Sequence, residues 1–113
     1  MHELALTEGI LDIISSEAKK QNFRKVEEIR LMVGEYSGVI PECIQEFFPI
    51  ASKGTAAEGA ELVFELVPAQ FQCLECGYLG KLRKQGYCCM ECGSTATKMI
   101  KGREFYVDSL KVE

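Results

Sequence analysis

The stretch FQCLECGYLGKLRKQGYCCMECG, residues 71–93, contains five of the six cysteines of the chain and decides how this part folds. Four of them form two Cys-x2-Cys pairs, twelve residues apart: Cys73 with Cys76, and Cys89 with Cys92. Two intervening residues let both thiolates of a pair face one ion from a tight turn, and the glycine after each pair permits the left-handed backbone of that turn. Because four sulfurs leave no open coordination position, the pattern predicts a structural metal site.

Cysteine spacing does not by itself select the metal. Zinc and iron both accept four thiolates, and we favour zinc because of its availability. Two disulfides are a further alternative, which a cytoplasmic location disfavours. Cys88 could replace its neighbour Cys89 by a slip in register, but only Cys89 gives the two-residue spacing. We interpret Cys43 and Cys88 as bystander thiols, because a catalytic cysteine requires a histidine base and the only histidine is His2.

The residues around the cysteine-rich stretch predict two helices and three strands. Apolar residues at spacings of three and four indicate a helix over residues 4–20 and another that begins at Pro41. Alternating apolar residues indicate strands over 25–33, 60–67 and 104–112. The expected buried stripes of the helices are Leu6, Ile10, Ile13, Ile14 and Ala18 in the first, and Ile44, Phe47, Phe48 and Ala51 in the second.

These elements predict an α+β fold in which two helices pack on a three-stranded sheet, with an inserted zinc ribbon of short β-hairpins. Short strands are expected over 78–82 and 97–100 inside the ribbon. We expect residues 1–70 plus 99–113 to form the α/β domain and residues 71–98 to form the zinc-ribbon domain.

Composition and charge exclude several classes of protein. The chain has 113 residues, is 47% hydrophobic and carries a net charge of −4, which is typical of a globular protein. No apolar run is long enough for a membrane span, and the start lacks the basic region of a signal peptide, so we expect a cytoplasmic protein. Glycine-rich phosphate loops, nucleophile–base pairs and open metal sites are all missing from the sequence, and we therefore expect no enzyme.

Positive charge concentrates in residues 71–103, which carry six basic and two acidic side chains. A nucleic-acid-binding zinc ribbon is therefore one alternative function. Only Tyr78 and Tyr87 are available there to stack on bases, and thiolates around a metal reduce the positive charge. We prefer a solvated basic face that docks an acidic partner. An electron-transfer protein with iron in the cysteine site is another alternative.

The N-terminus carries a second candidate metal site. The Met1 amine, the His2 amide nitrogen and the His2 imidazole can close two adjacent chelate rings, and Glu3 can add a backbone nitrogen or a carboxylate. A planar or tetragonal set of nitrogen and oxygen ligands suits Ni(II) or Cu(II). The alternative is that a histidine at a chain end is simply part of a frayed terminus.

The whole chain resembles the HypA/HybF family of nickel-insertion accessory proteins. The resemblance rests on both cysteine pairs with their glycines and on three short motifs: Met1-His2-Glu3-Leu4, Val33-Gly34-Glu35 and Pro41-Glu42. It implies a nickel metallochaperone for hydrogenase maturation that acts with the HypB GTPase on the precursor of the hydrogenase large subunit. It also implies nickel ligands at Met1, His2 and Glu3, structural zinc on the four paired cysteines, and no binding to nucleic acid or membranes. Residues 1–70 plus 99–113 would then be the nickel-binding domain.

The sequence departs from the family pattern at three places. Some members carry an acidic residue before the second helix that joins the nickel site, and here that position is Ile40. The second cysteine pair commonly has proline after its first cysteine, and here the residue is Met90. Histidines that flank the cysteine pairs in some members are absent. The oligomeric state is open: monomer and dimer are both compatible with the sequence, and exchange of the last strand would give a domain-swapped dimer.

Overall fold

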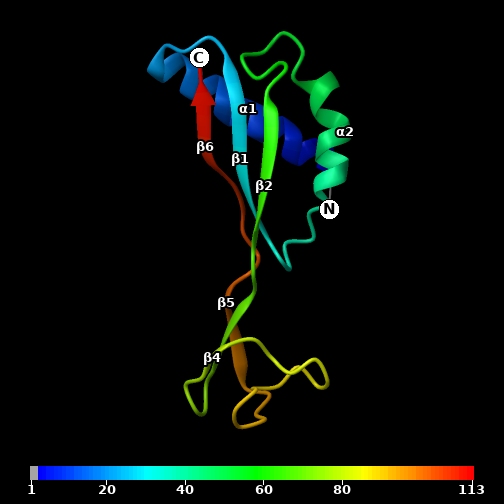
Figure 1. The fold of residues 1–113 in the computed structure, drawn as a ribbon, viewed down its shortest axis with the longest axis vertical. Helices are drawn as coiled ribbons and strands as arrows, with labels where there is room; N and C mark the ends of the chain where they lie inside the picture. The colour runs from blue at the N-terminus through cyan, green and yellow to red at the C-terminus, as the bar shows by residue number, and fades with distance from the viewer. Residues whose placement is uncertain (1–2) are drawn as a thin grey trace.

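A computed structural model describes residues 3–113 and shows an α+β fold of two helices and two small sheets. The first sheet has the strand order β2-β1-β6, with β1 (Val26–Gly34) parallel to β2 (Glu61–Val67) and antiparallel to β6 (Phe105–Val112). Helices α1 (Glu3–Gln21) and α2 (Pro41–Ala51) lie beside this sheet, in the upper part of Figure 1. The fold class and the positions of these five elements agree with the prediction to within one or two residues.

The main core lies between the two helices and the first sheet. Its buried side chains come from α1, β1, α2, β2 and the loop before β2, and they are Ile10, Leu11, Ile14, Val26, Ile29, Leu31, Ile44, Phe48, Ala57 and Leu62. The apolar stripes predicted for the helices supply Ile10, Ile14, Ile44 and Phe48 to this core.

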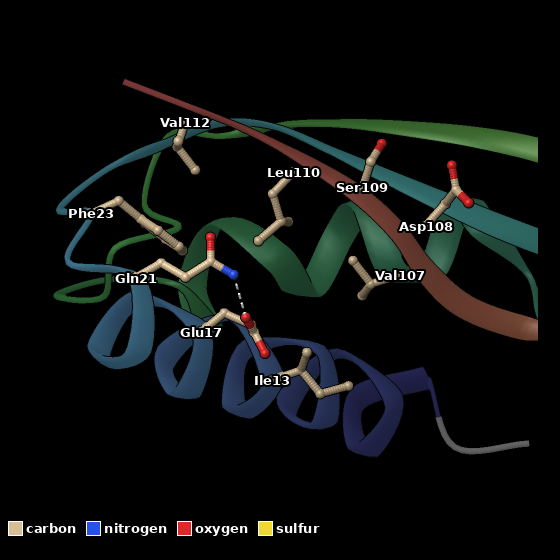
Figure 2. Close-up of a pocket in the computed structure, with 9 residues that line it drawn as sticks. All are labelled: Ile13, Glu17, Gln21, Phe23, Val107, Asp108, Ser109, Leu110 and Val112. Carbon is tan, nitrogen blue, oxygen red and sulfur yellow. Dashed lines mark hydrogen bonds between the residues drawn. The ribbon is translucent and has the colours of Figure 1, made fainter.

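Two residues of the predicted helix stripes, Ile13 and Phe47, are exposed, and so is Leu66 in the predicted strand over 60–67. Ile13 lies at the rim of a cavity of about 370 Å³ between α1 and β6, where the Gln21 side chain donates a hydrogen bond to Glu17 (Figure 2). Leu66 is exposed because it lies near the end of edge strand β2, beyond the part of the sheet that packs on the helices. Alternation correctly predicted the strand but not how far the core extends along it.

The second sheet has the order β4-β3-β5 and lies at the opposite end of the molecule (Figure 1). It consists of β3 (Gln70–Cys73), β4 (Leu79–Gly80) and β5 (Thr97–Lys101), all antiparallel. Strand β3 was not predicted, because its four residues follow Pro68 too closely to show an alternating pattern. The expected boundaries at residues 70/71 and 98/99 pass through β3 and β5, and the division into domains remains a prediction.

A narrow neck, formed by residues 34–36, 67–69 and 102–104, joins the two sheets. Backbone hydrogen bonds link Gly34 N–H to the Glu104 carbonyl at 2.6 Å and Tyr36 N–H to the Gly102 carbonyl at 2.7 Å. Carboxylates add to them: Glu35 Oε1 accepts from Ala69 N–H at 2.7 Å, and Glu104 Oε1 accepts from Gly102 N–H at 2.6 Å. The neck thus relies on backbone and carboxylate hydrogen bonds, and none of its residues belongs to the main core.

Neither helix described over residues 3–113 combines the length and the apolar character that crossing a membrane requires.

Candidate metal centre

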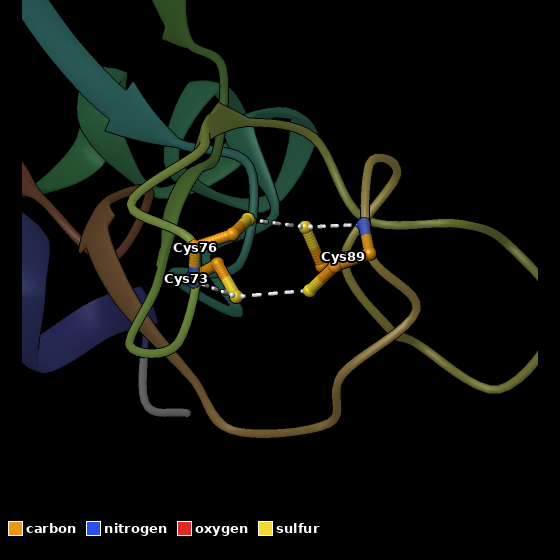
Figure 3. A group of neighbouring side chains, drawn as sticks. Cys73, Cys76 and Cys89 are labelled. Carbon is orange, nitrogen blue, oxygen red and sulfur yellow. Dashed lines mark hydrogen bonds between the residues drawn. The ribbon is translucent and has the colours of Figure 1, made fainter.

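The four paired cysteines converge at the end of the second sheet. Strand β3 ends at Cys73, and the turn after it carries Cys76. The second pair follows the isolated β-bridge between Leu82 and Cys89. All four Sγ atoms lie within 4.8 Å of one another, and the Cys73–Cys92 and Cys76–Cys89 Sγ distances are both 3.6 Å (Figure 3).

This sulfur cluster has the dimensions of a tetrahedral metal site. A Zn–S distance of about 2.3 Å places the sulfurs of a regular tetrahedron ~3.8 Å apart. A disulfide instead requires sulfurs about 2.05 Å apart, and all six cysteines are free thiols. The geometry therefore contradicts the disulfide alternative and fits a structural Zn(II) held by four thiolates. Iron has the same coordination pattern, so geometry alone does not separate the two metals.

The two cysteine pairs have nearly the same backbone geometry. Cys76 N–H points at Cys73 Sγ at 3.5 Å, and Cys92 N–H points at Cys89 Sγ at the same distance. In each turn the glycine N–H donates to the carbonyl of the first cysteine, and both glycines have a φ close to +78°. Backbone N–H groups directed at sulfur stabilise negative charge on it, so the turns prepare thiolates for a cation.

The four sulfurs differ in acidity. The Cys76 backbone N–H is the largest influence on Cys73 and outweighs burial, so the pKa of the Cys73 thiol is lowered to about 6. The Ser94 N–H acts to lower the pKa of Cys92, but the hydrogen bond with Cys73 and burial prevail and raise it to about 12. Four neighbouring thiolates would repel one another, so some of these cysteines keep their protons when no cation is bound. A bound cation therefore displaces those protons.

The remaining two cysteines lie outside the cluster. Cys88 directs its Sγ towards the Gln85 carbonyl at 3.9 Å, so the choice of Cys89 over Cys88 agrees with the geometry. Cys43 lies in the first turn of α2, and burial together with the carboxylates of Glu3, Glu46 and Glu42 raises the pKa of its thiol.

Of the predicted nickel ligands, Met1 and His2 lie outside the described residues. Glu3 begins α1, and its Oε2 accepts a long hydrogen bond, 3.4 Å, from the Ile40 backbone N–H just before α2. Glu3 is therefore next to the position that is acidic in some members of the family. Sequence reasoning could not find this contact, because it uses the backbone of Ile40 rather than its side chain.

Comparison with known proteins decides the family. Residues 1–112 match the family described as "Hydrogenase/urease nickel incorporation, metallochaperone, hypA". The chain belongs to the HypA family.

Curated relatives of this HypA-family chain carry the same name. A "Hydrogenase maturation factor HypA" from Caldanaerobacter subterraneus subsp. tengcongensis is 40% identical over an alignment of 114 positions that covers 100% of both chains. A protein of that name from Dehalococcoides mccartyi is 36% identical and is covered over 95% of its length. The resemblance found in the sequence is thus confirmed over the whole chain.

Solved HypA structures share the fold. A structure titled "Solution structure of HypA protein" aligns with a TM-score of 0.77 at 22% identity, over 100% of this chain and 97% of the other. The solution structure of the Ni metallochaperone HypA from Helicobacter pylori aligns with a TM-score of 0.71, also at 22% identity, over 99% and 97% of the two chains. At this identity the likeness establishes the arrangement of helices and sheets only.

Proposed function

We propose that this chain is a non-catalytic nickel metallochaperone for hydrogenase maturation. The Met1 amine, His2 and Glu3 hold Ni(II) as cargo, and Zn(II) on Cys73, Cys76, Cys89 and Cys92 stabilises the ribbon. The observation that carries the proposal is the family match, which includes the N-terminal Met-His-Glu as well as the cysteine pairs.

The chemistry of the N-terminus supports nickel as the cargo. Amine, amide and imidazole nitrogens form a planar or tetragonal set that suits Ni(II), whereas the sulfur cluster suits a tetrahedral ion. Glu3 begins α1, and its carboxylate accepts a hydrogen bond from the backbone N–H of Ile40, the residue just before α2. A site at the end of the chain, with few ligands, releases its metal more readily than an enclosed one.

Transfer requires partners, and we propose the HypB GTPase and the precursor of the hydrogenase large subunit, in the cytoplasm. The hydrogenase part of this proposal is supported by the names of the curated relatives, which are hydrogenase maturation factors. Binding to HypB is tested separately, by size-exclusion chromatography of the two purified proteins with and without Ni(II).

Calorimetric titration of Ni(II) into zinc-loaded, untagged protein tests the nickel site. One matched variant carries an additional glycine before Met1, which displaces the amine but keeps every side chain. The other is His2→Ala, which removes the only imidazole of the chain. We expect about one nickel per chain in the native protein, much weaker binding in the extended form, and loss of binding in His2→Ala, with zinc content and fold unchanged in both variants.

Equal nickel binding by the native and extended forms would place nickel elsewhere, with Cys43 and Cys88 as the first candidates. No binding by the native form would contradict the nickel role and leave a zinc-stabilised adaptor protein as the better description. Colour separates zinc from iron in the cysteine site, because an iron tetrathiolate is red and a zinc site is colourless.

A further inference from the structure

The connection between the two cysteine pairs carries three exposed cations, Lys81, Arg83 and Lys84. Within residues 3–113, the ion pairs involve Lys20 and Arg30 only, so none of these three cations has a carboxylate within ion-pairing distance. Arg83 is held in place, because its Nη2 donates to the Met90 carbonyl at 3.1 Å. The two lysine ammonium groups remain free to bind an anion.

These cations line a hollow of about 130 Å³ where the connection between the cysteine pairs faces the neck. We call this hollow the ribbon groove. Its other wall includes Tyr36 and Phe71, whose rings meet edge-on with centroids 6.1 Å apart. The groove thus combines free positive charge on one side with aromatic surface on the other.

Tyr87 adds a second exposed aromatic side chain to the groove. Its backbone has a φ of +48°, which is rare for a bulky residue. Backbone pairing on both sides of the turn fixes the conformation of Tyr87: Arg83 N–H donates to the Cys88 carbonyl at 2.8 Å, and Leu82 forms a β-bridge with Cys89. An exposed ring on a constrained backbone loses little conformational freedom when a partner covers it.

The size of the ribbon groove favours a protruding side chain over a small molecule. Ligand pockets typically have volumes of roughly 300–1,000 Å³, and this groove is smaller. One carboxylate, that of Glu35, also lines it and is engaged by the Ala69 N–H. A nucleic-acid backbone carries a phosphate at every step and would bring one close to Glu35. A peptide can instead place an uncharged aromatic residue next to Glu35 and its acids next to the lysines.

We infer that the ribbon groove docks an acidic, aromatic-containing peptide segment of a partner protein. Carboxylates of the segment pair with Lys81 and Lys84, and an aromatic residue packs between Tyr36 and Tyr87. The inference goes beyond nickel delivery and does not depend on it, because the groove shares no residue with the N-terminal site.

Fluorescence anisotropy with zinc-loaded, nickel-free protein tests the inference. The probe is a labelled peptide with the sequence Glu-Glu-Phe-Glu-Glu. We expect Lys81→Glu with Lys84→Glu to weaken binding at least ten-fold at low salt. The control pair Lys98→Glu with Lys53→Glu changes the net charge equally but lies outside the groove, and we expect an effect of two-fold or less. Tyr87→Asn, which tolerates the left-handed backbone, should weaken binding several-fold.

The inference would be overturned if the native protein did not bind the peptide, or if the Lys81→Glu and Lys84→Glu pair did not weaken peptide binding. It would also be overturned if the groove pair and the control pair weakened peptide binding equally. Tighter binding of a single-stranded oligothymidylate than of the peptide would instead identify a nucleic-acid surface. A zinc content of one ion per chain serves as the check of folding. If the variant Lys81→Glu with Lys84→Glu loses zinc, the variant Lys81→Gln with Lys84→Gln is used instead.

Discussion

Cys88 and Cys89 are adjacent in the sequence but have different environments. Cys89 is fully buried and bridges to Leu82, and its sulfur receives backbone N–H groups from Glu91 and Cys92. In extended backbone, consecutive side chains point to opposite sides, so Cys88 cannot join the cluster while Cys89 belongs to it. A shift of one position along the chain therefore decides whether a cysteine is a metal ligand or a thiol outside the cluster.

Replacing each of these two cysteines by serine should give opposite results. We expect Cys89→Ser to lose zinc and the structure of the ribbon, because three thiolates and a buried hydroxyl do not complete the tetrahedral site. We expect Cys88→Ser to keep one zinc per chain. Zinc content by atomic absorption, with circular dichroism for the fold, measures both. Retention of zinc by Cys89→Ser together with its loss in Cys88→Ser would reverse the assignment.

Glu104 makes the stability of the neck dependent on pH. Backbone N–H groups, first its own and then that of Gly102, hold the pKa of the Glu104 carboxyl below its usual value of 4.5. A carboxyl whose pKa is lowered by folding stabilises the protein above its unfolded pKa, and the contribution is lost as the pH falls through the folded pKa. We expect Glu104→Gln to lower the melting temperature at pH 7, with the difference from the native protein disappearing as the pH falls below 4.5.

Melting followed by circular dichroism between pH 3 and 7 measures this effect. Glu27→Gln is the matched control, because Glu27 is exposed and its side chain has no hydrogen bond or ion pair with residues 3–113. A difference between Glu104→Gln and the native protein that stays constant down to pH 3 would contradict the role of the ionised carboxylate.

At the scale of elements, β1 is the central strand of the first sheet and also leads into the neck. It pairs with β2 on one side as far as Gly34 and with β6 on the other as far as Val33. There the Gly34 backbone passes so close to Gly102 and Glu104 that an added Cβ would overlap their backbone atoms. The absence of a side chain at Gly34 is therefore what allows the sheet to continue into the neck.

Gly34→Ala should separate the strands at this point. We expect a destabilisation of about 1–3 kcal/mol, typical of overpacking, since the obstructing atoms belong to the backbone. Gly9→Ala is the control in α1, where an added Cβ meets nothing within 4 Å, and it should stabilise by about 0.5–1 kcal/mol because alanine favours helix. Urea unfolding of both variants measures the difference. Equal effects of the two substitutions would contradict the close approach at Gly34.

Local patterns predicted the elements well, whereas contacts distant in sequence escaped prediction. Periodicity identified α1 and α2, and the spacing of the cysteines identified the cluster, because each of these signals lies within a short stretch. The strand order, the neck and the contact of Glu3 with Ile40 each depend on a backbone group whose partner lies 30 or more residues away in the sequence. Backbone groups are the same in every residue, so the sequence carries no signal for which of them will pair.

The whole molecule is elongated, with extents of 54 × 26 × 17 Å and a radius of gyration of 17.9 Å. A compact chain of this length has a radius of gyration of about 13 Å. The difference arises because the two sheets lie at opposite ends of the neck and share no strand (Figure 1). The buried core residues belong to the α/β part, whereas Cys73 and Cys89 are the buried apolar residues of the ribbon.

Removal of zinc should therefore unfold one end of the molecule and leave the other intact. The ribbon has too little apolar surface to fold without a cross-link, and metal binding supplies that stability. We expect a chelator to abolish the hydrogen-exchange protection of amides in β3 and β5 and to leave protection in β1 unchanged, as measured by mass spectrometry of peptic fragments. Added zinc should restore the lost protection, since the α/β part keeps the neck in place. Equal loss of protection in β1 would mean that the two ends fold as one cooperative unit, and the division into two domains would then be wrong.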